Sequence, residues 1–364
     1  MGLILLLIYS LLAPALGLLY AVFFLLSPRR ALLKSLAGEL GERLAPLDFY
    51  PLAAKFIACY RPRLLVLVET EIWPATLYAA ANAGVPVFMV NARISNGTAA
   101  LYRALGPLSR LAFCGVKQVL AQTEKDAARF RRLPGLAAKV TVTGNLKYDQ
   151  LGVSAAGQDK VREFLEASDW GNSPVFTAGS THPAEEPAVI SAWLEAKKKT
   201  PALKLVLVPR HPEKLSEAET VLTAGGTPFM RWSATVVPEE TDCLLVDAMG
   251  LLQAFYAVST VCFVGGTLDK TGGHNVLEPA LFSKPALFGP NYANARNAGD
   301  ALIKEKGGFL VETAPEMAAK ISELLSDPAA LGAARENAAR TISGLRGATA
   351  RTMAAVAQSC PPDK

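Results

Sequence analysis

The sequence has few of the features that mark metal-binding, disulfide-stabilised or nucleic-acid-binding proteins. Its five cysteines are scattered singly, with no CxxC pair and no histidine at a zinc-ligand spacing, which argues against a structural zinc or a disulfide framework. The formal net charge is only +5, and no basic run is interleaved with aromatics, so a nucleic-acid partner is not expected. The composition therefore indicates a reduced compartment, no metal site and no nucleic-acid function.

Charge is also missing from the N-terminus, where Met1–Leu26 contains no Asp, Glu, Lys or Arg. At ~1.5 Å per helical residue, this stretch is long enough to span the core of a bilayer. Basic residues follow within 29–34, and the positive-inside rule then places the remaining chain on the cytoplasmic side. A cleaved signal peptide is the alternative, although the apolar run is long and no charged segment precedes it. The sequence predicts a single-pass transmembrane anchor over residues 1–27.

The rest of the chain alternates short β-rich runs with longer helical ones, and 51% of all residues are hydrophobic. This alternation is typical of an α/β fold in which crossover helices connect parallel strands. Gly, Ser and Ala interrupt the rhythm at Leu151–Gln158, which predicts a linker. We expect two doubly wound domains, 28–150 and 151–364, with ligands bound at the carboxyl ends of their strands in a cleft.

The predicted secondary structure divides at the same linker. Strands are expected at Leu64–Val68, Val85–Val90, Gln118–Ala121, Val140–Thr143, Val175–Ala178, Leu203–Val208, Cys243–Val246, Val261–Val264, Ala286–Phe288 and Gly308–Val311. Helices fill the gaps between them, including Glu124–Arg132, Glu186–Lys198, Glu213–Ala224 and Ala314–Leu325.

The three histidines of the chain each come just after a predicted strand. They are His182, His211 and His274. A single loop histidine is more often structural or solvated, but three at equivalent positions favour a binding site at that edge of the sheet. Ser180, beside His182, could donate to an anion or could simply cap the next helix.

Glycines are concentrated in segment 265–279, which contains Gly-Gly pairs on both sides of a short loop. Glycines allow a ligand to approach the backbone, and a helix start beyond them would offer amides to a phosphate. Glu278 would then lie in the first helical turn and accept from ribose hydroxyls; alternatively, it only favours the helix start. Arg210 ends an apolar strand and could bind a phosphate or carboxylate with two hydrogen bonds, or be an ordinary surface cation. The spacing is neither a Walker A nor a dinucleotide fingerprint.

The first half of the chain offers a second set of charged candidates. Glu69 and Glu71 follow an apolar strand and are candidates to face a ligand. In the alternative interpretation, Glu71 caps the helix that begins at Pro74 and Glu69 is solvated. Lys147, close to the predicted linker, could neutralise charge on a ligand or be an ordinary solvated lysine.

Together these segments resemble the Kdo (3-deoxy-D-manno-octulosonic acid) transferases of Gram-negative bacteria. The resemblance covers nearly the whole chain, including the N-terminal anchor. The matching stretches are ETEIWP at Glu69–Pro74, NARIS at Asn91–Ser95, VTGNLKYD at Val142–Asp149, GSTHPAEE at Gly179–Glu186, LVPRHPE at Leu207–Glu213 and GGTLDKTGGHNVLEPALFSKPALFGP at Gly265–Pro290.

The resemblance implies a membrane-anchored glycosyltransferase of the GT-B type in lipopolysaccharide core biosynthesis. Its donor would be CMP-Kdo, its acceptor a lipid A precursor (lipid IVA), and its mechanism inverting and free of cofactors and metals. It would be located at the inner membrane, with its body facing the cytoplasm. A GT-B enzyme that uses a UDP-sugar is a further alternative, disfavoured because these motifs match as a set.

The resemblance also assigns residues. Glu69 and Lys147 match positions of transition-state stabilisation, and Leu251 stands where many relatives have Glu. The residues that would contact CMP are Pro209, Arg210, Met249, Gly250, Asn275, Val276, Leu277 and Glu278. Further candidates for the donor site are Ser180, His182, His211, Gly273 and His274.

The chain departs from the family pattern near its N-terminus. Between the basic helix at Arg30–Arg43 and the segment at Pro46–Asp48, relatives carry about two βα units, including a loop whose Gly-Glu supplies the general base. Here that stretch is absent, and Glu42 aligns with the basic helix instead. The sequence therefore predicts an internal deletion, an incomplete first domain and an exposed sheet edge. Loss of a general base costs about 10²–10⁴ in rate, so the alternative function is a membrane-tethered CMP-Kdo-binding remnant.

Overall fold

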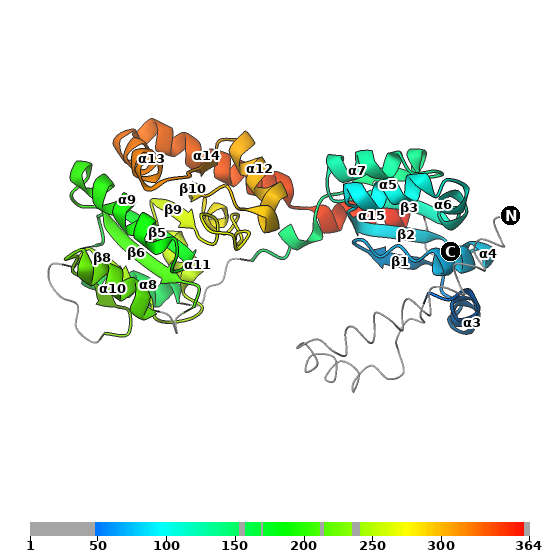
Figure 1. Cartoon of the computed structure of the whole chain (residues 1–364), viewed down its shortest axis with the longest axis horizontal. Coiled ribbons are helices and arrows are strands. Elements are labelled where there is room, and N and C mark those ends of the chain that lie inside the picture. The colour runs from blue at the N-terminus through cyan, green and yellow to red at the C-terminus, as the bar shows by residue number, and fades with distance from the viewer. Residues whose placement is uncertain (1–47, 153–156, 169, 212–214, 235–240, 360–364) are drawn as a thin grey trace. The chain divides into compact units, whose positions relative to one another are not determined.

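The computed structural model describes residues 48–152, 157–168, 170–211, 215–234 and 241–359. These residues form two compact units, one ending at Asp149 but rejoined by the chain from Arg346 onward, the other spanning Gln150–Leu345 (Figure 1). No helix within the described ranges is long and apolar enough to cross a bilayer. The anchor at residues 1–27 and the basic helix at Arg30–Arg43 lie outside those ranges and stay predictions.

The first unit contains a four-stranded parallel sheet with the order β1-β2-β3-β4. All four strands were predicted, with ends that differ by at most two residues. Their bounds are β1 Leu65–Val68, β2 Val87–Ala92, β3 Val116–Ala121 and β4 Val140–Val142. The helices of this unit are α3 Tyr50–Tyr60, α4 Pro74–Asn82, α5 Asn96–Ala104, α6 Pro107–Ala112, α7 Glu124–Arg131 and α15 Ala348–Ser359.

Short polar side chains fix where the helices of the first unit begin. Ser95 and Thr123 precede α5 and α7, and each hydroxyl accepts a backbone N–H from the first turn. At α4 the cap comes from a distant residue, because the carboxylate of Asp48 accepts the N–H groups of Ala75 (3.2 Å) and Thr76 (2.8 Å). These bonds satisfy amides that a helix start leaves without partners.

Strand β1 forms an edge of this sheet, since among the described strands it pairs only with β2. Val66 and Val68 lie opposite Phe88 and Val90 and share their face. The two β2 side chains are buried, whereas Val66 is 42% and Val68 49% exposed. An exposed edge was expected in this domain, and among the described strands β1 is an edge with the partly exposed apolar side chains of Val66 and Val68.

Helix α15 belongs to the first unit, which corrects the predicted second domain of 151–364. The carboxylate of Asp149 accepts the N–H groups of Gly347 and Thr349, both at 2.6 Å, and so caps the start of the helix. This cap and apolar packing together attach α15 to the first unit. Ala355 and Val356 of α15 pack against the β2–β3 face formed by Phe88, Val90 and Leu120.

The second unit contains a seven-stranded parallel sheet with the order β11-β10-β9-β5-β6-β8-β7. From β5 the sheet grows through β6 and β8 in one direction and through β9, β10 and β11 in the other. Such a reversal leaves a crevice at the carboxyl ends of the two strands where it occurs, here β5 and β9. The α/β class with parallel sheets is therefore confirmed.

The strands predicted for this unit all form, and the two-residue strand β7 was missed because it is too short to show a pattern. The strand bounds are β5 Val175–Thr181, β6 Lys204–Pro209, β7 Met230–Arg231, β8 Cys243–Leu245, β9 Val261–Val264, β10 Ala286–Phe288 and β11 Gly308–Leu310. The α-helices are α8 Gln158–Ala167, α9 Glu186–Lys199, α10 Leu215–Ala224, α11 Leu252–Val258, α12 Arg296–Lys304, α13 Ala314–Ser326 and α14 Pro328–Leu345. Apolar clusters cover both faces, one around Trp193 and the other around Trp170.

Replacing the capping carboxylate tests how α15 is attached. We expect Asp149→Ala to destabilise the first unit by about 0.5–2 kcal/mol and to speed amide exchange in Ala348–Ser359. Amide hydrogen bonds from Thr349 and Gly347, which outweigh the opposing effect of burial, lower the pKa of Asp149. The cap is therefore present above the ordinary carboxyl pKa and is lost as pH falls through the lowered one.

Hydrogen exchange read by mass spectrometry and urea unfolding measure this effect. The matched control is Asp159→Ala on α8, which removes an exposed carboxylate paired with Arg162 three residues on; it should change stability by less than ~0.5 kcal/mol. Unchanged exchange in α15 of the Asp149→Ala protein would contradict the assignment of this helix to the first unit.

Candidate donor site

Three loops that follow neighbouring strands meet at the carboxyl edge of the second sheet. They come after β5, β6 and β9, which are adjacent in the order β9-β5-β6. The N–H of Gly265 donates to the carbonyl of Gly179 (2.8 Å), and the N–H of Arg210 donates to that of Thr181 (2.9 Å). Both loops are thereby fastened to the end of β5, at the reversal point of the sheet.

All three histidines come together at this edge. The Nε2 atoms of His182 and His274 are 2.9 Å apart, and the ring planes differ by 13°. The His211 ring stands edge-on to His182, with centroids 5.7 Å apart. Burial lowers the pKa of His274, and the neighbouring His182 and Arg210 lower it further, while Asp269 opposes them. The three histidines lie far apart in the sequence but come together because each follows one of three adjacent strands.

A buried carboxylate that the sequence analysis did not single out organises these loops. Glu185 is 1% exposed, and its oxygens accept the N–H groups of Gly266 (2.6 Å), His182 (3.0 Å) and Leu268 (3.2 Å). One side chain therefore ties the loop after β5 to the loop after β9. Burial raises the pKa of Glu185, and the three amide bonds oppose that rise.

The sequence held one weak signal for this role, a pair of acidic residues at the start of a predicted helix. The second of them, Glu186, is also buried and accepts a hydrogen bond from the Thr181 hydroxyl (3.0 Å). Burial raises the pKa of Glu186 to about 7. Carboxylates at a helix start are normally solvated, so a sequence pattern alone does not reveal such burial.

Two glycines let the loop after β9 lie against its neighbours. Gly266 has φ +68°, and a Cβ there would be 2.9 Å from Cδ2 of His274. At Gly265 a Cβ would overlap the carbonyl oxygen of Ser180. Ser180 itself has a positive φ of 55°. Gly273 is similarly confined, with φ +84° and Tyr292 next to it. These glycines permit close packing between loops, and their predicted use, the approach of a ligand to the backbone, stays a prediction.

Arg210 lies near both halves of the site. Burial lowers the pKa of His274 and the exposed Arg210 guanidinium adds to this effect, whereas at Glu278 the guanidinium opposes the rise in pKa that burial causes. Burial is the main influence on Glu278 and raises its pKa, and a hydrogen bond from Asn275 acts in the opposite direction. The structure therefore brings together Arg210, Asn275 and Glu278, the residues that were predicted to grip a cytidylate.

The expected helix after Glu278 is absent, which corrects one prediction. Glu278 precedes a four-residue 3-10 helix, Pro279–Phe282, so no α-helical N-terminus points at a ligand there. Val276 and Leu277 are fully buried, and their side chains belong to the core. Neither residue is exposed in this structure, and the N–H of Leu277 already donates to Asn275 Oδ1 (3.2 Å), so their predicted contacts with CMP stay predictions.

Pro209 ends β6, while Met249 and Gly250 follow β8, the strand next to it. Met249 is 70% exposed, and Gly250 has φ +84° with open space around it. Leu251, where many relatives have Glu, packs in the core around Trp170. The Met249–Gly250 loop thus lies at the carboxyl edge of the second sheet, as predicted, while the side chain of Leu251 faces the interior.

In the first unit, Glu69 and Lys147 lie side by side. Glu69 follows β1 with φ +62°, and its carboxylate pairs with Lys147 Nζ (3.0 Å) and with Arg93 (3.4 Å). The side chain of Asn91 accepts the N–H of Leu146 (3.0 Å) and so holds the loop that carries Lys147. Strained backbone at Glu69 and Asn91, which has φ +51°, is typical of functional positions.

Glu71 does not cap α4, so that alternative is wrong. Its carboxylate accepts the indole N–H of Trp73 at 2.6 Å, and Asp48 caps the helix instead. Of the two carboxylates in the ETEIWP segment, Glu69 is the one that pairs with Lys147 and Arg93.

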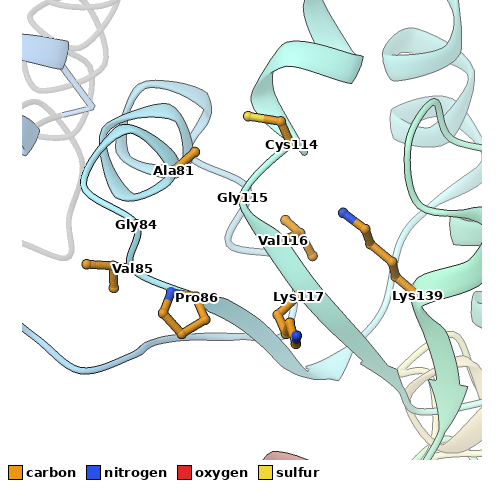
Figure 2. Close-up of a pocket in the computed structure, with 9 residues that line it drawn as sticks. All are labelled: Ala81, Gly84, Val85, Pro86, Cys114, Gly115, Val116, Lys117 and Lys139. Atoms are coloured by element: carbon orange, nitrogen blue, oxygen red, sulfur yellow. The ribbon is translucent and has the colours of Figure 1, made fainter. Parts of the chain in front are cut away.

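A surface hollow of about 560 Å³ lies elsewhere in the first unit (Figure 2). It is lined by residues that precede β2 and β3, among them Pro86 and Gly115, and by Lys117 and Lys139. Parallel strands place this hollow at the amino edge of the sheet, whereas Glu69 follows the carboxyl end of β1. The hollow is therefore separate from the candidate site. Among the described residues, no group of His, Cys, Asp and Glu could hold a metal ion.

Comparisons with known proteins agree with this fold. The chain is similar to a putative UDP-N-acetylglucosamine 2-epimerase from Listeria monocytogenes, with a TM-score of 0.52 at 15% identity over 84% of this chain and 77% of that one. It is also similar to the C-terminal CMP-Kdo binding domain of WaaA from Acinetobacter baumannii, with 29% identity and a TM-score of 0.49 over 52% of this chain and 99% of that one. The fold belongs to the GT-B-like α/β class.

Sequence relatives identify the family. Residues 26–150 match the family model described as 3-deoxy-D-manno-octulosonic-acid transferase (kdotransferase). The 3-deoxy-D-manno-octulosonic acid transferase of Bordetella pertussis is 33% identical over 324 residues, 88% of this chain and 74% of that protein. The chain belongs to the Kdo transferase family of glycosyltransferases, as its motifs indicated. It spans 65%, 41% and 64% of the length of the next three curated relatives it matches.

Substitution of Glu185 tests whether its buried carboxylate orders the site. Glu185→Gln keeps the shape but replaces one acceptor oxygen by an N–H₂ group, which leaves at least one buried amide without a partner. We expect a loss of about 1–3 kcal/mol in the free energy of unfolding, measured by denaturant titration.

The exposed Glu195 on the same helix, paired with Lys198, supplies the control. Glu195→Gln should change the free energy of unfolding by less than ~0.5 kcal/mol. Equal stability of the two variants would show that the loops after β5 and β9 do not depend on Glu185.

Proposed function

We propose that this chain transfers Kdo from CMP-Kdo to a lipid A precursor, lipid IVA, in lipopolysaccharide core biosynthesis. The observation that carries the proposal is the convergence of Arg210 and the histidine pair at the carboxyl edge of the second sheet, where the Arg210 N–H donates to the carbonyl of Thr181 and the Nε2 atoms of His182 and His274 are 2.9 Å apart. Family membership supports the transferred sugar. The anchor predicted over residues 1–27 supports a place at the inner membrane, with the body on its cytoplasmic side.

The donor site is assigned to the second unit. A guanidinium can bind phosphate oxygens with two parallel hydrogen bonds, and Arg210 is exposed for such a contact. Glu278 is close enough to Arg210 for the guanidinium to influence its pKa, and its carboxylate can accept hydrogen bonds from ribose hydroxyls. Asn275 holds Glu278 in place through its amide, and the Met249–Gly250 loop borders the same edge of the sheet.

The acceptor side is assigned to the first unit. In an inverting transfer, the acceptor hydroxyl attacks the anomeric carbon as CMP leaves, and its proton must pass to a base. Lys147, held beside Glu69, supplies positive charge that favours negative charge developing in the transition state. Because Glu69 is already paired with Lys147 and Arg93, we assign it to orienting these cations rather than to taking the proton.

A second candidate function is a CMP-Kdo-binding remnant without transferase activity. The exposed apolar face of the edge strand β1, at Val66 and Val68, favours it, because the resemblance expects two further βα units and the general base in this region. Full-length protein in membranes, incubated with CMP-Kdo and lipid IVA, separates the two functions by the mass of added Kdo. Donor binding without product would select the remnant.

Removal of the predicted phosphate-binding cation should weaken CMP binding. We expect Arg210→Ala to raise the dissociation constant of CMP about 10- to 100-fold, since a hydrogen bond to a charged group contributes about 1.5–3 kcal/mol. Isothermal titration calorimetry of the full chain measures this change.

Arg231→Ala is the matched control, because Arg231 lies on the edge strand β7 and pairs with Glu219. It should leave CMP affinity unchanged. If the wild-type protein gives no heat with CMP, or if Arg210→Ala binds CMP as tightly as wild type, the donor-site assignment fails.

Transfer should depend on Lys147 more than binding does. We expect Lys147→Ala to lower kcat by about 10²–10³ while the dissociation constant of CMP stays unchanged, because the lysine lies in the other unit. Mass-spectrometric counting of Kdo–lipid IVA product over time measures kcat.

Lys139→Ala, which removes a lysine from the hollow at the amino edge, serves as the control and should keep full activity. Loss of CMP affinity in Lys147→Ala, or a kcat equal to that of wild type, would contradict the assigned role.

A further inference from the structure

The two Nε2 atoms of His182 and His274 face each other along a line. Their separation is 2.9 Å, while the ring centroids are 5.2 Å apart and the ring planes differ by 13°. The distance between the ring centroids is 2.3 Å longer than the distance between the two Nε2 atoms. This difference equals the sum of the two centroid-to-Nε2 distances, so both nitrogens lie on the line that joins the centroids. The rings therefore meet edge to edge in one plane, as a linear N–H···N hydrogen bond requires.

This geometry fixes the protons of the pair. One ring must donate through Nε2–H, and the other must accept through an Nε2 lone pair, which places the proton of the accepting ring on Nδ1. Both rings are then neutral, and Nδ1 of the donating ring is a base. Adding one proton there keeps the inter-ring hydrogen bond and makes it charge-assisted. A second added proton would have to bind the accepting Nε2, where its N–H would point at the N–H of the other ring. The pair can therefore carry no more than one positive charge.

Other charged groups act on the pair from each neighbouring element. Arg210 and His211 approach from the loop after β6 and disfavour positive charge on His274, while Asp269 in the loop after β9 favours it. From the start of α9, the carboxylate of Glu185 binds backbone amides of both loops. Gly266 lies directly against the junction, where a Cβ would be 2.9 Å from Cδ2 of His274 and 3.6 Å from Nε2 of His182.

We propose that His182 and His274 act as one anion-binding unit that takes up a single proton when the donor phosphate binds beside Arg210. This inference rests on the proposed function. The proton comes from solvent, and the new N–H bond forms at Nδ1 of the donating ring. In the free site Arg210 supplies the positive charge while the histidine pair is neutral, and in the occupied site the pair adds one positive charge against the phosphodiester.

The coupling makes donor affinity depend on pH. In the free site, burial lowers the pKa of His274 from its usual 6.5, and His182 and Arg210 lower it further, so the neutral ring is favoured near neutral pH. An anion at the site shifts that pKa upward, so binding and protonation favour each other. Affinity for a singly charged phosphodiester should rise as pH falls from about 8 to about 6, by at most tenfold per pH unit, because one proton is taken up.

Calorimetry with the full chain tests the proposal. The probe is the methyl ester of CMP, whose phosphodiester holds a constant single charge over this range; cytidine, which has no phosphate, is the control ligand. Titrations in two buffers of different ionisation enthalpy count the protons. We expect net uptake approaching one proton per bound ester near pH 7.5, and none with cytidine.

Histidine variants test whether the proton that is taken up binds to the His182–His274 pair. His182→Gln and His274→Gln should each abolish proton uptake and flatten the pH dependence of ester affinity. His211→Gln should keep the uptake, since the inter-ring hydrogen bond remains. Because the chain has only three histidines, ¹⁵N spectra of labelled imidazoles in these variants report each tautomer directly.

The outcomes separate this inference from the proposed function. Ester binding without proton uptake, or uptake that survives in His274→Gln, would overturn the role of the pair while the donor site stands. Absence of ester binding to the wild-type protein would instead overturn the proposed function. Spectra that show two neutral Nδ1–H tautomers would contradict the inter-ring hydrogen bond itself.

Discussion

The site of the second unit depends on a carboxylate that water cannot reach. Glu185 takes three backbone amides from two loops, and a buried charge of this kind is tolerated only when it is fully hydrogen-bonded. The loops after β5 and β9 are therefore held at one separation. That separation lets His182 reach His274 and leaves Arg210 beside Glu278. The chemistry assigned to this edge of the sheet follows from the constraint.

Much of this arrangement could be predicted because sheet topology converts sequence position into proximity. Apolar runs such as Ala286–Phe288 revealed the strands, and histidines after three of them pointed to a common edge. What could not be predicted depended on tertiary burial. Glu185 is no different in sequence from a solvated helix start, and the expected α-helix is only the 3-10 helix Pro279–Phe282 because the backbone turns left-handed at Ser283, with φ 56°. The roles of the donor-site residues stay predictions.

The first unit shows the limit of the resemblance more clearly. Its ETEIWP and VTGNLKYD segments come together as Glu69 beside Lys147, so the local features of the family are kept. The sheet around them has an apolar face at Val66 and Val68 open to solvent. The geometry of these motifs is therefore formed within the described residues. The predicted shortening of the N-terminal region, and with it the source of the proton acceptor, stays a prediction.

The cap on α15 has a consequence for how the protein can be dissected. Because the chain leaves the first unit at Asp149 and returns to it at Arg346, the second unit is a continuous insertion between two pieces of the first. A fragment containing residues 150–345 keeps every strand of the larger sheet, whereas a fragment that stops at residue 149 lacks the helix that covers Phe88 and Leu120. The two halves of this molecule are therefore unequal in folding autonomy, and the helix Ala348–Ser359 near the C-terminus belongs to the N-terminal half.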